Sequence, residues 1–391
     1  MMLNKSISPA QPIRSAFKKE GLVILTVWAM VNGILLLKNG IISTGESQKY
    51  ISEAQAFIET GRVSKNNFLL YFTQIGLLAF SIKLKLGFVF TVAVQLFFNL
   101  LAIFSFFGMS LKIFKRKITA LIASILLLLN LPYQEFNTML QTESLFYSFT
   151  LLYSCYLIQI ERLSLKHICC IVLWLLVISV TRPTGLLFIP PTFVYLFFNF
   201  FRKMNSYKKM SLLILIAFFF IYALDKALGS GGEFDFMLPF RNEEIICGVP
   251  VLPASVHIET ASTPNSVYGL IYYISHNPGQ FTRLAWLKTL AFFGLYRSYY
   301  SSAHNIYLIL FFYPFYIGMI FGIPAWSKSH SYKFLYFFLV ITMTWLTAIL
   351  TCDDWHNRFY LSISPYLILI GMSTVSVIIR NNKDRNQDAI R

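Results

Sequence analysis

Long apolar runs separated by short basic segments dominate the chain. They lie at about 21–37, 86–110, 118–131, 144–160, 167–181, 184–201, 209–227, 304–325, 334–351 and 358–379. Several are shorter than the roughly 20 residues that a helix needs to cross a bilayer, so their boundaries are approximate. The pattern predicts an all-α polytopic membrane protein with about ten transmembrane helices. We treat residues 1–391 as a single integral membrane domain.

A further apolar run covers residues 68–82 and is bracketed by Lys65, Lys83 and Lys85. We interpret it as a segment at the membrane interface, within a first extracytoplasmic loop that spans residues 38–85. The alternative is an eleventh span, which would invert the orientation of everything that follows and break the charge pattern described next.

The charge distribution gives the orientation. The chain is 56% hydrophobic and 13% charged, and its net charge is +16. The basic residues cluster in short loops between the apolar runs, as the positive-inside rule requires of cytoplasmic loops. We therefore expect both termini in the cytoplasm, an uncleaved N-terminal signal anchor and no nucleic-acid partner.

In this orientation most acidic residues face the extracytoplasmic side, together with a long polar loop at about 228–303. Gly and Pro residues in that loop are compatible with a mobile, folded or lid-like segment. Cys247 and Cys352 share this side, so a disulfide between them is one alternative and two free thiols are the other. No Cys or His spacing typical of a metal site is present.

The first candidate for chemistry follows the first apolar run. Glu46 precedes Tyr50, Ala54 and Phe57 at helical spacing, and Thr60-Gly61 supplies a helix stop. A short helix lying on the membrane would hold the Glu46 carboxylate at its N-terminal edge. A general base needs such a fixed position near an acceptor hydroxyl.

Two further candidates stand at the outer ends of apolar runs. Glu143, in Gln141-Thr142-Glu143-Ser144, is either a polar helix cap or a residue that binds substrate. Arg182 lies in Thr181-Arg182-Pro183-Thr184-Gly185, where Pro and Gly explain a turn but not an Arg. A guanidinium at that depth suits a lipid-linked phosphate.

The last candidate motif is Asp353-Asp354-Trp355-His356-Asn357-Arg358-Phe359-Tyr360. Its alternative explanation is an interfacial loop with an aromatic anchor. The adjacent carboxylates could hold a divalent cation, but we assign no residue as a metal ligand.

The first-loop pattern, Glu46 with Tyr50 four residues later and Gly61 after Thr60, resembles the membrane-embedded GT-C glycosyltransferases. The resemblance is to the branch of the protein O-mannosyltransferases and the lipid A aminoarabinose transferase. It extends to the acid at Glu143, the basic turn at Arg182, and Arg358 with Tyr360 before a final span. The family usually has Asp, often followed by Glu, where this chain has Glu46-Ser47.

The resemblance implies transfer of a sugar from a polyprenyl-phosphate donor to a lipid, glycan or protein hydroxyl, with inversion. Glu46 would be catalytic, and Tyr50, Glu143, Arg182, Arg358 and Tyr360 would bind substrate. The sequence has no nucleotide-binding motif, which argues against a nucleotide-sugar donor and for a lipid-linked one. We expect a cell-envelope enzyme of a bacterial inner membrane, surrounded by membrane lipids.

Two alternatives remain open. A surface-polysaccharide polymerase or ligase would depend on Arg and His residues of the long loop more than on Glu46. A transporter or flippase should carry ionisable residues at mid-membrane and show related halves.

Overall fold

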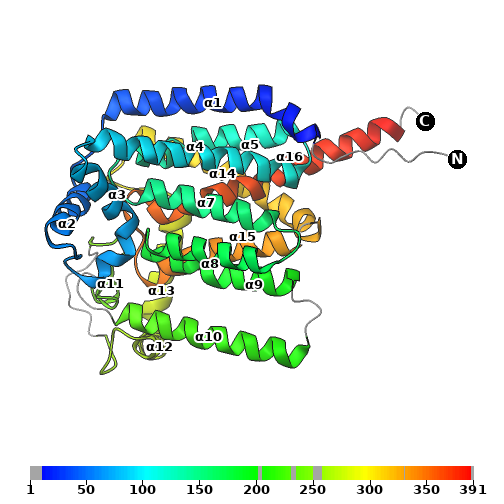
Figure 1. The fold of residues 1–391 in the computed structure, drawn as a ribbon. Coiled ribbons are helices and arrows are strands. Elements are labelled where there is room, and N and C mark those ends of the chain that lie inside the picture. The colour runs from blue at the N-terminus through cyan, green and yellow to red at the C-terminus, as the bar shows by residue number, and fades with distance from the viewer. Residues whose placement is uncertain (1–10, 201–204, 230–234, 250–257, 330, 389–391) are drawn as a thin grey trace. The chain divides into compact units, whose positions relative to one another are not determined.

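The computed structural model describes residues 11–200, 205–229, 235–249, 258–329 and 331–388. Within these ranges the chain is helical with a few isolated β-bridges and no strands, so the all-α prediction is confirmed (Figure 1). Every predicted apolar run coincides with helical structure: α1 (Gln11–Asn39), α4 (Gly87–Phe114), α5 (Lys117–Leu129), α7 (Glu143–Gln159), α8 (Leu165–Ser179), η3 (Pro183–Phe188) with α9 (Ile189–Phe200), α10 (Ser206–Leu228), α14 (Ser302–Ser329), α15 (Ser331–Leu350) and α16 (Arg358–Asp388).

Five helical segments of the described residues are long and apolar enough to cross a membrane. They are Lys19–Asn39, Gly87–Phe114, Pro183–Phe200, Ser302–Pro324 and Tyr332–Leu350. A sixth is added if Lys117–Leu129 and Leu131–Thr138, which meet at a 62° bend, form one broken span. The chain is therefore an α-helical integral membrane protein, and the predicted count of ten spans is not confirmed.

The chain divides into two compact units. The first comprises residues 1–64, 72–159 and 375–391, and the second comprises 65–71 and 160–374. The helix α16 contributes residues to both units.

In the first unit, α1, α4, α5 and α7 lie side by side (Figure 1). Almost every residue of α7 is buried, as expected for a helix that is apolar all round. Polar side chains inside this packing pair with one another: Trp28 Nε1 donates to Asn99 Oδ1 at 2.9 Å, and Asn137 Nδ2 donates to Asn32 Oδ1 at 2.9 Å. Such pairing removes the cost of burying an unsatisfied polar group.

The first loop folds into two short helices at one end of α4 (Figure 1). The first, α2 (Glu46–Thr60), ends where the backbone of Gly61 turns left-handed (φ 70°) and its N–H bonds to Phe57 O. The second, α3 (Phe72–Lys83), has 12 residues. It follows directly on the 3-10 helix η1 (Asn66–Tyr71), and this stretch is not among the described helical segments that are long and apolar enough to cross a membrane, which fits an interfacial segment better than an eleventh span.

The second unit contains α8 to α15 and the start of α16. The helix α15 packs against α9, α13 and α14. The described parts of the predicted long loop form the helices α11 (Leu238–Arg241), α12 (Val267–His276) and α13 (Pro278–Gly294). These helices bury a core of their own, made of Phe236, Met237, Phe240, Leu270, Tyr273 and Leu284. The loop is thus folded here, and its parts 230–234 and 250–257 lie outside the described residues.

Candidate functional site

Glu46 is the first residue of α2 and follows Gly45, whose φ is 62°. Its half-buried carboxylate accepts a hydrogen bond from the Tyr50 hydroxyl at 2.9 Å. Tyr50 is itself 1% exposed, so packing fixes the ring that orients the carboxylate. A carboxylate at a helix N-terminus is also stabilised by the helix dipole. Glu46 is therefore held in one orientation, which general-base chemistry requires.

The neighbouring acid Glu53 has a different environment. It is 5% exposed, and its two oxygens accept from the backbone N–H and the hydroxyl of Ser64, both at 2.6 Å. These bonds hold the segment that follows Gly61 against α2. The contacts explain Glu53 as a structural residue of the first loop.

Glu143 is fully buried and begins α7. Its Oε2 accepts from Thr142 Oγ1 at 3.4 Å, and the dipole of α7 favours a negative charge at this end. Both the helix-cap and the substrate-binding interpretations fit this position, so its substrate role stays a prediction.

Arg182 lies in the tight turn between α8 and η3, and 8% of it is exposed. The turn depends on Gly185, because a Cβ there would lie 2.4 Å from Ile178 O. Arg182 Nη2 donates to Asp354 Oδ2 at 2.6 Å, and the guanidinium stands 5.6 Å from the centre of the Phe359 ring. The turn and the Asp353-to-Tyr360 motif, far apart in sequence, therefore meet in the second unit.

The two adjacent aspartates bind different arginines. Asp353 is fully buried and pairs with Nη2 of the buried Arg297, while Asp354 pairs with Arg182. Burial raises the pKa of the Asp353 carboxyl to about 6, although the Arg297 guanidinium opposes this shift. A buried pair of this kind is costly to break from one side, because the remaining charge is left uncompensated.

The same contacts test whether these aspartates fit a cation. The four carboxylate oxygens accept from Arg297, from the Asp354 N–H, from Arg182 and from the Trp355 N–H. No cluster of three or more metal-binding side chains occurs among the described residues. The aspartates do not fit a divalent cation in this arrangement, and we derive no step through one.

Arg358 is the first residue of α16 and is 8% exposed. The two residues before it, His356 and Asn357, have positive φ values of 57° and 55°. Non-glycine residues in this conformation are strained, and such strain concentrates at functional sites. Tyr360 is 0% exposed and its hydroxyl accepts from Tyr316 at 2.5 Å. Those contacts are typical of a core residue, so its substrate role stays a prediction.

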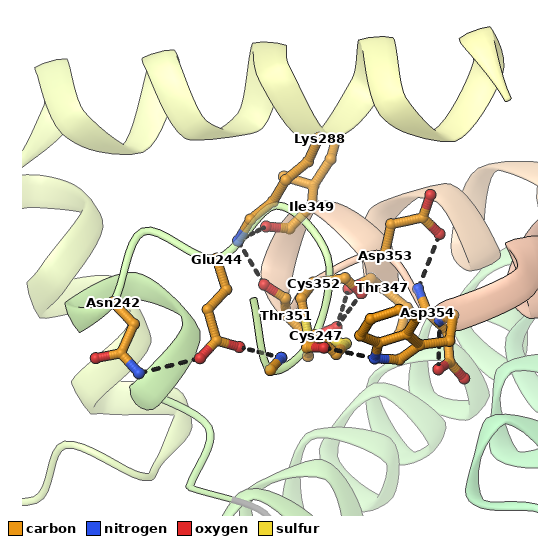
Figure 2. Close-up of a disulfide and its surroundings, with 12 residues drawn as sticks. Asn242, Glu244, Cys247, Lys288, Thr347, Ile349, Thr351, Cys352, Asp353 and Asp354 are labelled. Carbon is orange, nitrogen blue, oxygen red and sulfur yellow. Dashed lines mark hydrogen bonds between the residues drawn. A yellow bond between two sulfur atoms is a disulfide. The ribbon is translucent and has the colours of Figure 1, made fainter. Parts of the chain in front are cut away.

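A disulfide joins Cys247 of the long loop to Cys352 at the end of α15 (Figure 2). The sequence left this pairing open. Two backbone bonds accompany it: Cys247 N–H donates to Asp353 O at 3.0 Å, and Asp353 N–H donates to Ile245 O at 2.8 Å. The loop is thus tied directly to the predicted motif.

Lys288 of α13 is, like Arg297, a buried basic residue that the sequence did not indicate. Its Nζ donates to the carbonyls of Ile349 and Thr351 at the end of α15 (Figure 2). The same nitrogen lies 4.4 Å from the centre of the Phe240 ring. Burial lowers the pKa of Lys288 to about 7, and the nearby Glu244 opposes the shift. A single Lys in an amphipathic stretch gives no local signal of this burial.

Comparison with protein-family models, with curated proteins and with solved structures gives no match for this chain.

Proposed function

We propose that the protein is a membrane glycosyltransferase that uses a polyprenyl-phosphate-linked sugar and resembles the GT-C enzymes. The observation that carries this proposal is the Glu46 carboxylate, which begins α2 just after the first membrane-spanning helix and is oriented by Tyr50 at 2.9 Å. The proposal also includes about ten transmembrane spans, cytoplasmic termini and location in a bacterial inner membrane.

The reaction would be a single displacement at the anomeric carbon. The Glu46 carboxylate takes the proton of an acceptor hydroxyl while its oxygen attacks the sugar. The bond between the anomeric carbon and the phosphate oxygen breaks, and polyprenyl phosphate leaves with the electron pair. The resemblance alone implies that Arg182 and Arg358 bind the phosphate, where they would offset its developing charge. The anomeric configuration inverts.

The alternative, a polysaccharide polymerase, would use Arg and His residues of the long loop. Of those described, Arg241 pairs with Asp235, Arg283 pairs with Glu243, Arg297 pairs with Asp353, and His276 stacks on a neighbouring tyrosine. Substitution of Glu46 distinguishes the two functions, because a polymerase that depends on these loop residues would keep its activity without the Glu46 carboxylate.

The test compares Glu46→Gln with Glu59→Gln in nanodiscs. Glu59 is an exposed acid on the same helix and is the matched control. We expect Glu46→Gln to lower the transfer rate from a labelled polyprenyl-phosphate sugar by at least about 100-fold, within the range of general-base effects, and Glu59→Gln to keep it. Near wild-type turnover by a folded Glu46→Gln variant would refute the assignment of the base.

A further inference from the structure

The carboxylate of Asp354 binds the Arg182 guanidinium directly. Asp354 Oδ2 accepts from Arg182 Nη2 at 2.6 Å, and both side chains are largely buried. The other oxygen of Asp354 accepts from the Trp355 N–H at 2.8 Å, so the carboxylate itself has a fixed rotamer. A guanidinium presents its five N–H donors in one plane, and a carboxylate bound at one edge therefore fixes the plane in which a second anion is met.

The backbone that carries Asp354 is clamped by the long loop. The disulfide at Cys352 lies two residues before it, and Asp353 exchanges backbone hydrogen bonds with the segment 245–247. Trp355, the residue after Asp354, donates from its Nε1 to Cys247 O at 2.8 Å. The buried Arg297 holds the Asp353 side chain. Figure 2 shows the disulfide and the residues around it.

We propose that Asp354 is a positioning residue that aims Arg182 at an anionic phosphate, and that the disulfide between Cys247 and Cys352 keeps Asp354 in place. The inference rests on the proposed function for its ligand, the phosphate of the polyprenyl carrier. The inference adds that phosphate binding by Arg182 depends on whether the disulfide is oxidised, although neither cysteine is assigned to the phosphate.

Reduction has a defined chemistry here. A dithiol reductant such as dithiothreitol transfers two electrons and two protons to the disulfide, which gives two cysteine thiols and the oxidised cyclic reductant. The loop segment 245–249 then loses its covalent tie to the residue two positions before Asp354. The same release is made permanent by the double variant C247S/C352S.

The experiment measures the Kd of a long-chain polyprenyl monophosphate in nanodiscs and the KM and kcat of sugar transfer. The proteins are wild type, Asp354→Asn, Asp354→Glu, C247S/C352S and the control Glu59→Gln. We expect Asp354→Asn to raise Kd and donor KM about tenfold with kcat changed less than about twofold, and Asp354→Glu to recover part of the loss. Dithiothreitol should raise the Kd of wild type toward that of C247S/C352S and leave the double variant unchanged.

Two results would overturn the inference. The first is an unchanged Kd in Asp354→Asn together with insensitivity of wild type to dithiothreitol. The second is tighter binding in Asp354→Asn, which would mean that Asp354 competes with the phosphate for Arg182.

A wild-type protein that binds no polyprenyl phosphate would contradict the proposed function instead. Hydrogen exchange of the turn 181–186 then decides the positioning: faster exchange in Asp354→Asn supports it, and unchanged exchange overturns it.

Discussion

Substitution of Lys288 by Met tests the packing of the long loop against α15 through a pH dependence. Lys288 is 0% exposed, and its Nζ is bound to two backbone carbonyls at the end of that helix. Burial lowers its pKa from 10.5 to about 7, while the unfolded chain keeps the ordinary value. Between these two values the unfolded state binds more protons, so stability through this residue rises as pH rises.

The size of the effect follows from the two pKa values. At pH 8 nearly all folded molecules have a neutral Lys288, and the slope approaches 1.36 kcal/mol per pH unit, the energy of one pKa unit. From pH 7 to pH 9 the gain in the free energy of unfolding is about 2 kcal/mol. Met has a similar volume and no charge, so Lys288→Met should lack this gain.

The assay is thermal or denaturant unfolding of the detergent-solubilised protein at pH 6, 7, 8 and 9, with wild type and Lys288→Met in parallel. The difference between the two proteins isolates Lys288 from all other titrating groups. We expect wild type to gain stability relative to the variant across pH 7–9. Parallel curves for the two proteins would refute the buried, neutral lysine.

Two smaller changes test the first loop. Glu53→Ala should lower the free energy of unfolding by about 2 kcal/mol, because two hydrogen bonds from Ser64 to a buried carboxylate are lost. Glu59→Ala should change it by less than about 0.5 kcal/mol. Chemical unfolding measures both, and equal effects would contradict the role of Glu53. Tyr50→Phe should lower kcat about tenfold and keep KM, because the ring still packs but the hydroxyl bond of about 1–1.5 kcal/mol to Glu46 is lost; a changed KM with constant kcat would argue for direct substrate binding.

The helices were predictable because their signals are local. Apolar runs of sufficient length mark each long helix, and the stop at Gly61 marks the end of α2 through its left-handed backbone. The spacing from Glu46 to Tyr50 places both side chains on one face of a helix, and their hydrogen bond follows from it.

The contacts of the second unit depend on residues far apart in the chain. Arg297 and Asp353 are 56 positions apart, and Cys247 and Cys352 are 105 apart. No periodicity or motif connects such pairs; they meet because α13 packs beside α15 and the segment 245–247 bonds to the backbone of Asp353. For the same reason the sequence suggests that Asp353 and Asp354 act together as a pair of carboxylates, whereas in the structure each binds its own arginine.

The stereochemistry of the transferred sugar tests the central claim most directly. Wild-type protein in nanodiscs is given a polyprenyl-phosphate sugar of known anomeric configuration and an acceptor, and the product is examined by NMR. Displacement assisted by the Glu46 carboxylate predicts a product whose anomeric configuration is opposite to that of the donor. A product with the donor's configuration would contradict the single displacement and the role of Glu46 as its base.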